Sequence, residues 1–443
     1  MVKTSWLSAV TPAILLALVI FASTLSAAEW KEKVLYSFQG GANGSVPAGG
    51  VVFDKAGNLY GVTFDGLVFQ LKPPVQKGRA WTENRLYVFQ GVSKGDGSTP
   101  SGGLVIDSAG NLYGVTAYGG TGNCVLLGSV VGCGTVYEIS PPKEKGGVWE
   151  ETILYSLSTA RQGYLPNGNL VFDSAGHLYG ATMFGGSKGT TCNEFYGGQC
   201  GVVFELSPPK SKGGKWTEKV LYGFASGTDG ASPNGGLVLD GKGNVCGTTF
   251  GGGDESGECG TVGCGTAFEI KPPATKGGTW KEKILYRFHG QDGATPTAGV
   301  VLGRSGELYG TVSAGAISGN GAVFSLVATG DHGSWKETAL YRFQDGNDGL
   351  SPRSALTLDR GGNLYGTAFG GQTFRGVVFR LKPAKIGQPW MFSLLYNFQG
   401  SPDGANPAAA LTFDAGELYG TTQFGGTSQT CQGGCGTAFE LSP

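Results

Sequence analysis

The sequence of 443 residues predicts an all-β fold, a seven-bladed β-propeller whose N-terminal strand closes the last blade. The phrase GGLVIDSAGNLYG, at residues 102–114, recurs seven times with small variations, so one structural unit repeats along the chain. After residue 28 no stretch has apolar residues at helical spacing, and Gly, Pro, Asn and Asp separate short apolar runs. The chain ends supply a third observation, because one extra strand precedes the first repeat and the last repeat lacks one.

Each repeat predicts four strands. In the second repeat these are GGLVID at 102–107, NLYGVT at 111–116, GTVYEI at 134–139 and WEETILYSL at 149–157. The first should lie innermost, because it opens on small residues that can crowd around a central axis. Asp107 and Gly110 predict a tight turn after it. A tryptophan opens the fourth strand of every repeat, and we interpret these tryptophans and the repeated tyrosines as the core between blades.

The two ends of the chain favour a closed ring over an open solenoid of the same strands. The segment 30–38 has the pattern of a fourth strand but no blade of its own, and the last repeat ends on its third strand, GTAFEL at 436–441. The first strand can therefore complete the last blade. In an open solenoid this complementarity would have no structural role, and the strands at both ends would have unpaired edges exposed to solvent.

Residues 1–28 predict a signal peptide. Lys3 is followed by an apolar run at 13–22 and by the small residues Ser26, Ala27 and Ala28, where a signal peptidase would cut. The run is too short to cross a bilayer, which needs roughly 20 residues. We expect residues 29–443 to form a single propeller that is secreted, periplasmic or on the cell surface, with no membrane span. A net charge of −1 argues against nucleic acid as a partner, and we expect a monomer.

The repeats carry the phrase D-x-x-G-N-L-Y-G-T-T, a Gly-rich loop, then G-T-x-F-E-L, with W-x-E-x-x-L-Y-x-F between copies. This pattern resembles the GloVer tandem-repeat proteins of bacteria over essentially the whole chain after the signal peptide. The resemblance implies an exported, propeller-like protein, often with a C-terminal anchor, and it supplies no activity or catalytic residues. The sequence ends at Pro443 without a hydrophobic tail, so we expect no anchor.

Chemistry should be sought where the repeats differ, and the loop between the second and third strands differs most. It is a tight turn at Asp65 and Gly66 in the first blade, but long, Gly-rich and supplied with two cysteines in the second, third, fourth and seventh. In an exported chain these cysteines predict four disulfides, Cys124–Cys133, Cys192–Cys200, Cys259–Cys264 and Cys431–Cys435. A zinc site at Cys259 and Cys264 is the weaker alternative, since no histidine accompanies them. Cys246 is predicted to be a buried free thiol.

Two groups of residues on this side of the ring are candidates for binding a ligand. Aromatic side chains end the second strands and could stack on sugars or simply cover the core; they are Tyr118, Phe184, Phe250, Phe369 and Phe424. Charged residues that do not repeat form the second group; they include Glu255 and Arg353, and the first candidates among them are Arg161, Glu194, Asp254, Glu258 and Arg375. The three histidines occupy different repeat positions, so we expect no histidine-based metal centre or catalytic triad.

No cofactor is expected, with one open alternative. An Asp-Gly pair recurs between blades, and such a ring of carboxylates could bind calcium. The favoured interpretation is that each Asp caps a turn; the residues are Asp96, Asp229, Asp292, Asp348 and Asp403.

The leading hypothesis is an exported binding or scaffolding propeller that recognises a glycan or a cell-surface protein through its long loops. The alternative is an extracellular polysaccharide hydrolase or lyase that uses acidic residues of the same face, with Glu194 and Glu258 as the first residues to test. A purely structural role in the envelope is the third possibility.

Overall fold

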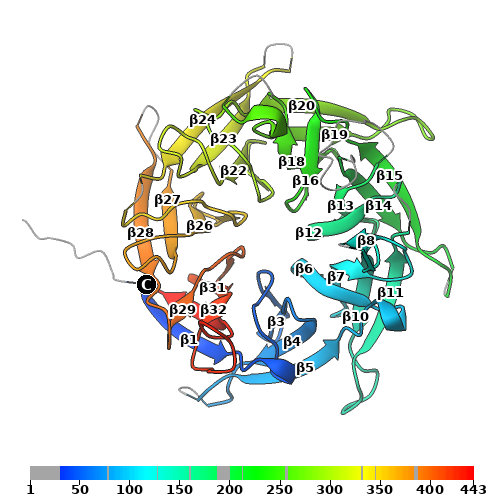
Figure 1. Cartoon of the computed structure of the whole chain (residues 1–443), viewed down its shortest axis with the longest axis vertical. Coiled ribbons are helices and arrows are strands. Elements are labelled where there is room, and N and C mark those ends of the chain that lie inside the picture. The colour runs from blue at the N-terminus through cyan, green and yellow to red at the C-terminus, as the bar shows by residue number, and fades with distance from the viewer. Residues whose placement is uncertain are drawn as a thin grey trace, which may run out of the picture.

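The computed structural model confirms the predicted propeller: seven blades of antiparallel strands surround a central axis (Figure 1). It describes residues 30–76, 79–126, 128–158, 161–186, 200–211, 213–254, 258–330, 333–344, 346–383 and 388–443. The predicted signal peptide lies outside these residues. Within them the only helices are single 3₁₀ turns, η1 (Gly41–Asn43), η2 (Val92–Lys94) and η4 (Gly260–Val262).

The strands of each blade run from the axis outward. Blade 1 consists of β2 (Val52–Phe53), β3 (Leu59–Val62), β4 (Leu67–Lys72) and β5 (Thr82–Val88). Blade 2 consists of β6 (Gly97–Ile106), β7 (Leu112–Gly119), β10 (Thr135–Ser140) and β11 (Glu150–Ser156), with the small hairpin β8 (Val125–Leu126) and β9 (Ser129–Val130) in its loop. Blade 3 consists of β12 (Tyr164–Phe172), β13 (Leu178–Phe184), β14 (Val202–Ser207) and β15 (Thr217–Gly223).

The remaining blades repeat this order. Blade 4 consists of β16 (Gly230–Pro233) and β17 (Val238–Leu239), both paired with β18 (Val245–Gly252), then β19 (Thr266–Lys271) and β20 (Lys281–Arg287). Blade 5 has β21 (Val301–Leu302), β22 (Leu308–Val312), β23 (Ala322–Ala328) and β24 (Trp335–Arg342). Blade 6 has β25 (Thr357–Leu358), β26 (Leu364–Ala368), β27 (Val377–Lys382) and β28 (Met391–Asn397).

Blade 7 contains both ends of the described chain, as predicted. It consists of β30 (Thr412–Asp414), β31 (Glu417–Thr422) and β33 (Thr437–Ser442), and its outermost strand is β1 (Lys31–Ser37). A short ladder of β29 (Gly404–Ala405) and β32 (Phe424–Gly425) extends it. β1 pairs with β33 from Lys31 opposite Ser442 to Ser37 opposite Thr437. The ring is therefore closed by backbone hydrogen bonds between the first and last strands.

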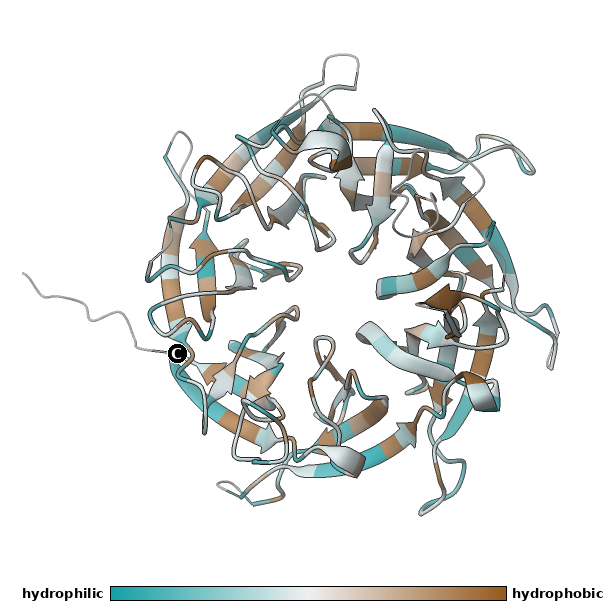
Figure 2. Cartoon of the chain, viewed as in Figure 1, coloured by the Kyte–Doolittle hydropathy of each residue, from teal (hydrophilic) through white to brown (hydrophobic). Residues whose placement is uncertain are grey.

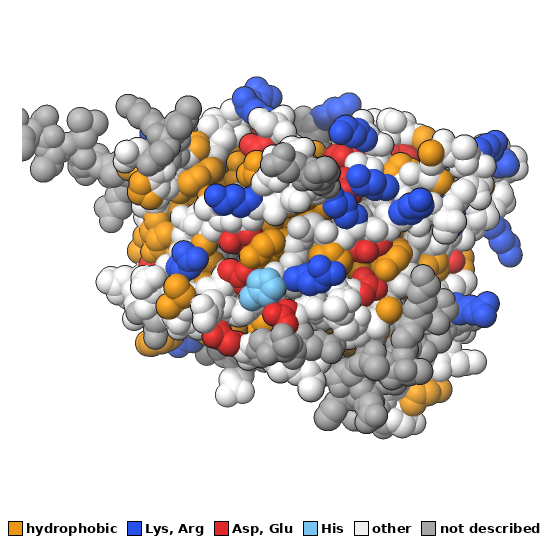
Figure 3. All heavy atoms as spheres, turned by 90° about the horizontal axis from the view of Figure 1, so that it is seen from above, with side chains coloured by type: hydrophobic (Ala, Val, Ile, Leu, Met, Phe, Trp, Pro, Cys, Tyr) orange, Lys and Arg blue, Asp and Glu red, His pale blue; other side chains and the backbone are white. Residues whose placement is uncertain are grey.

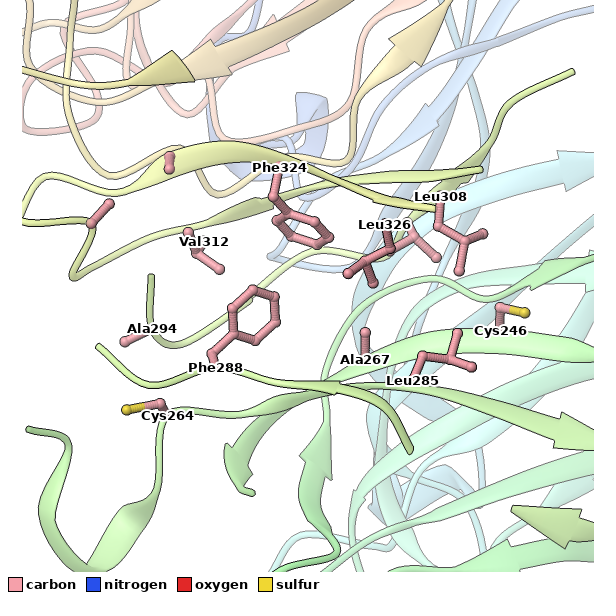
Figure 4. Packing of buried hydrophobic residues seen from close by; sticks show 13 residues of the cluster. Cys246, Cys264, Ala267, Leu285, Phe288, Ala294, Leu308, Val312, Phe324 and Leu326 are labelled. Atoms are coloured by element: carbon pink, nitrogen blue, oxygen red, sulfur yellow. The ribbon is translucent and has the colours of Figure 1, made fainter. Parts of the chain in front are cut away.

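The hydrophobic cores lie between neighbouring blades, because both faces of the inner strands are covered. Figure 2 shows hydrophobic residues concentrated on the strands and hydrophilic ones on the outer loops. Between blades 4 and 5, Phe288 follows β20 and contacts Phe324 of β23, with their ring centroids 5.1 Å apart (Figure 4). Cys246 belongs to this cluster as the predicted buried free thiol, and burial raises its pKa to about 12. The thiol is therefore protonated at neutral pH.

The repeated tryptophans pack where the sequence predicts, on the tyrosine of the preceding blade. Trp149 of blade 2 lies 5.9 Å from Tyr60 of blade 1, measured between ring centroids. Trp280 of blade 4 contacts Tyr179 of blade 3 in the same way, at 6.4 Å. The same contact joins blade 7 to blade 6 through Trp30 and Tyr365, and blade 6 to blade 5 through Trp390 and Tyr309.

The Asp of the repeated turn organises the entry to the second strand. In blade 1, Asp54 Oδ1 accepts hydrogen bonds from the Ala56 and Asn58 amides, and Oδ2 accepts from the Asn58 side chain and the Tyr60 hydroxyl. Burial alone would raise the pKa of Asp54, but these hydrogen bonds outweigh it and hold the pKa below its usual value. The turn is therefore an ionised carboxylate enclosed by donors, which explains the repeated D-x-x-G-N-L-Y.

A second repeated feature, a residue with positive φ, lies where each inner strand contacts the preceding blade. The residue preceding the inner-strand proline has a positive φ in all seven blades, between 49° and 58°. A side chain is strained in this conformation, and contacts with the neighbouring blade compensate for the strain. In blade 5 the Thr295 amide donates to the Cys264 carbonyl at 2.9 Å, and a Cβ added to Gly265 would lie 2.6 Å from Pro296 Cδ.

We therefore expect Gly265→Ala to destabilise the propeller by about 2–4 kcal/mol, because the added Cβ would overpack against the Thr249 carbonyl oxygen and Pro296 Cδ and because the φ of this residue is +89°. Gly277→Ala is the matched control, because Gly277 has a φ of +83° but no atom within 4 Å of an added Cβ. It should cost about 1 kcal/mol. Chemical denaturation of both variants measures the difference. Equal losses in the two variants would show that strain at φ, and not the close contacts of the added Cβ, explains the repeated glycine.

Candidate functional site

Two kinds of connection meet on one face of the ring, which we call the loop face. They are the loops from the second to the third strand of a blade and the connections from an outer strand to the next inner strand. Between blades 4 and 5, for example, Ala294 of a connection pairs with Ala314 of a loop. The variable loops therefore lie beside the segments that lead to the central axis.

Disulfides brace this face. The predicted pairs Cys124–Cys133, Cys259–Cys264 and Cys431–Cys435 are present as disulfides, in agreement with the favoured interpretation of these cysteines. Cys192 lies outside the described residues. The second cysteine of a pair is buried and its carbonyl accepts a hydrogen bond from the next inner strand, as Cys133 does from Leu165 and Cys435 from Val46. The disulfides thus hold the carbonyls that join neighbouring blades.

The ring of Asp residues between blades acts as turn caps and as acceptors for tyrosine. Asp96 Oδ2 accepts from the Tyr87 hydroxyl at 2.9 Å and from the Gln90 amide, and Oδ1 accepts from the Gly97 amide. The same tyrosine contact recurs at Asp229, Asp292, Asp348 and Asp403. Among the residues that the structure describes, no group of three Asp, Glu, His or Cys side chains is arranged to hold a metal ion.

Several ionisable side chains meet on the loop face between blades 4 and 5. His289 Nδ1 is 2.8 Å from Asp254 Oδ2, and the His289 amide donates to Asp292 Oδ1 at 2.8 Å. Glu258 Oε1 accepts from Gln291 Nε2 at 3.2 Å. Figure 3 shows the propeller edge-on, from the side that lies at the top of Figure 1, where acidic and basic side chains lie close together on the rim. We call Asp254, Glu258, His289 and Gln291 the blade 4–5 cluster.

A cavity of about 460 Å³ adjoins the cluster. Phe250 and Val262 supply apolar surface, with Val262 49% exposed, and Glu258 supplies a carboxylate on the same wall. The disulfide at Cys259 forms part of the lining. A cavity with apolar walls and a few polar groups is the usual form of a small-molecule site.

The cluster also has the parts of a proton-transfer group. A carboxylate hydrogen-bonded to Nδ1 orients an imidazole and leaves Nε2 to act on a ligand. The His289 side chain is half exposed, whereas that of Asp254 is mostly covered. The orienting partner is therefore fixed while the imidazole faces solvent.

The structure brings three of the predicted residues together, Phe250, Asp254 and Glu258, and distributes the others around the ring. Tyr118 lines a second cavity of about 430 Å³ between blades 1 and 2. Phe184 is only 6% exposed and packs on Tyr164, whereas Phe369 and Phe424 are 41% and 38% exposed. Arg161 and Arg375 are exposed in blades 3 and 6, and Glu194 lies outside the described residues.

Sequence reasoning missed His289 because it searched for a cluster of histidines. A usable signal was present, since four repeats have Gln at this position, Gln39, Gln90, Gln344 and Gln399. His289 is thus a titratable residue at a position that is usually an amide.

The sequence signature of the Gloeobacter/Verrucomicrobia repeat matches residues 19–262 and 256–443. No curated protein matches the chain in sequence. Among solved structures, a PL25 polysaccharide lyase, an ulvan lyase, is similar with a TM-score of 0.51 and 12% identity, covering 92% of this chain and 95% of its own. The PQQ-bound aldose sugar dehydrogenase of Streptomyces coelicolor gives a TM-score of 0.45 at 13% identity, covering 94% and 98%. At these identities the likeness concerns the fold alone.

The described residues contain no helix that is long and apolar enough to cross a membrane. Disulfides form and persist in oxidising compartments, so the three bridges are consistent with a protein outside the cytoplasm.

Proposed function

We propose that this chain, which belongs to the Gloeobacter/Verrucomicrobia repeat family, is a secreted propeller that recognises a glycan at the cavity beside the blade 4–5 cluster. The observation that carries the proposal is the composition of this one place. It combines an aromatic ring, exposed aliphatic surface and several hydrogen-bonding side chains, and a disulfide fixes the loop. Sugars present an apolar ring face and hydroxyl edges, so they match such a surface.

Replacing Phe250 with Ala should weaken glycan binding at least tenfold, because it removes the aromatic wall of the cavity. The matched control is Phe64→Ala, since Phe64 has the same repeat position in blade 1, is 54% exposed and adjoins only a tight turn. The first measurement is a thermal-shift screen of the wild-type protein against polysaccharides and cell-wall fragments. Calorimetry with the best ligand then compares the two variants. Equal affinities of both variants and wild type would place the binding elsewhere.

A second function, glycan cleavage by acid–base chemistry, is favoured by one observation, the 2.8 Å contact between His289 and Asp254. In this case His289 would transfer a proton at the sugar and Asp254 would hold the imidazole, with Glu258 as a second acid or base. His289→Gln should then abolish product formation while the affinity for the glycan changes little. Chromatography of the bound glycan after incubation separates the two functions, because a binding module releases no shorter product.

A further inference from the structure

The residue type on the wall of the central channel differs from blade to blade at one repeat position, the residue after the inner-strand proline. We call these seven positions the channel ring. Five consecutive blades, 2 to 6, have polar residues there. Ser101 of blade 2 donates its hydroxyl to the Pro166 carbonyl. The residues of blades 3 to 6 line the central cavity, and we call them the polar arc: Asn167, Asn234, Thr297 and Arg353. On the opposite side, blades 7 and 1 place Ala408 and Ala48. A structural role shared by all blades would not produce this asymmetry, because the neighbouring proline is the same in every blade.

The channel is open space beside these side chains. A cavity of about 460 Å³ is lined by the polar arc, the two alanines and the backbone of the small residues that follow them. Figure 1 shows the inner strands of all seven blades facing this axis. A sugar-sized ligand would therefore meet polar groups on one side and small residues on the other.

The polar arc is only partly satisfied within the protein. The Asn167 amide donates to the Asn234 backbone carbonyl at 3.3 Å and contacts the Asn234 side-chain oxygen. Thr297 Oγ1 is buried and has no hydrogen-bond partner in the described chain. Arg353 donates from Nε to Ser351 Oγ at 3.3 Å, and no described carboxylate forms an ion pair with its guanidinium. The arc thus offers the unneutralised Arg353 guanidinium to the cavity, and the covered Thr297 hydroxyl beside it lacks a hydrogen-bond partner in the described chain.

We propose that the channel ring binds the carboxylate of an acidic sugar, with Arg353 as the partner of the anion and the Asn and Thr side chains as partners of hydroxyls. The planar guanidinium matches a carboxylate with two parallel hydrogen bonds. This inference rests on the proposed function and names its ligand class as uronate-containing glycans. The two places are joined by one connection, which carries His289 at its outer end and Thr297 at the channel.

The test compares acidic and neutral forms of one ligand. Oligomers of galacturonate, glucuronate and mannuronate are titrated into the purified protein by calorimetry, each as the free acid and as the methyl ester. The wild-type protein should bind at least one free acid tenfold or more tightly than its ester. Arg353→Gln should remove this preference and leave the affinity for the ester unchanged. Arg353 is exposed, so the variant should fold normally, as its unfolding temperature can verify.

Arg360→Gln is the matched control, because Arg360 is also exposed, lies at the other end of the inner strand and loses the same charge. It should retain the preference for the acid. Equal affinity of wild-type protein for acid and ester, no binding of any of the three acids, or an unchanged preference in Arg353→Gln would overturn the inference. Binding of a neutral glycan that needs Phe250 but not Arg353 would overturn it while leaving the proposed function intact.

Discussion

Removal of residues 30–38 should open the ring and lower the free energy of unfolding by more than about 5 kcal/mol. The deletion leaves β33 without its outer partner along six paired positions. It also removes Leu35 and Phe38, which are 4% and 0% exposed and each contribute roughly 1.5–3 kcal/mol by burial. The exposed edge of β33 is a template for pairing with another chain, so the truncated protein should also associate.

The experiment adds the missing strand as a separate peptide with the sequence of residues 30–38. Denaturation should show that this peptide restores most of the lost stability, because it can re-form the pairing with β33. The control peptide carries Pro in place of Val34, the residue that pairs with Phe439. Proline has no backbone N–H, so the substitution should disrupt the pairing between the peptide and β33. Light scattering follows the association. A truncated protein with wild-type stability and no association would show that the ring does not depend on its closing strand.

Raising the pH from about 5 to 8 should destabilise the propeller, and a ring of glutamates on the outer strands is the reason. Burial raises the pKa of Glu151 to about 7, with the charge of Asp96 adding to the effect. Glu282 and Glu337 also reach about 7 beside Asp229 and Asp292, and Glu32 reaches about 8 beside Asp403. Glu218 reaches about 7 by burial alone. One carboxylate oxygen of each of these five residues is buried without a hydrogen-bond partner in the described chain.

The sign follows from proton uptake. An unfolded Glu titrates near 4.5, so between that pH and about 7 to 8 the folded protein holds more protons than the unfolded one. Stability therefore falls as the pH rises through this window and levels off above it. These side chains are partly exposed, and after a discount for solvent screening each contributes about 1 kcal/mol, or about 5 kcal/mol together.

Glu151→Gln tests the assignment, because the amide is neutral at every pH. The variant should unfold at a higher temperature than wild type at pH 8 and at nearly the same temperature at pH 5. Glu150→Gln is the matched control, since Glu150 is the preceding residue of the same strand and is exposed. It should leave the pH profile unchanged. A wild-type unfolding temperature that is flat from pH 5 to 8 would refute the role of the glutamates.

The fold was predictable from the sequence because the same pattern recurs in seven repeats, so each local assignment could be compared with the other copies. The turn at Asp54, the tryptophan on the preceding blade and the closing strand β1 each follow from a pattern that the blades share. The local disulfides were equally predictable, since each pair lies within one loop.

The candidate sites were less predictable, since they depend on contacts between repeats. Asp254 and His289 are 35 residues apart in different blades, and only the closed ring brings them within 2.8 Å. Arg353 could be recognised as a residue that does not repeat, but its place on the channel follows only from the direction of its strand. The proximity of the raised-pKa glutamates to Asp96, Asp229, Asp292 and Asp403 was unpredictable for a similar reason. Each glutamate lies on an outer strand, and its aspartate lies on the connection that enters the same blade.

Closure by β1 also has a kinetic consequence. Lys33 and Glu440, whose side chains lie 3.4 Å apart, are separated by 407 residues. Bringing such distant segments together costs about 5 kcal/mol of chain entropy when nothing between them is folded, and little once the intervening blades have assembled. The closing strand should therefore dock last. Until it does, the last blade can accept β1 of another molecule, so protein concentration during refolding should decide between closed monomers and strand-exchanged polymers.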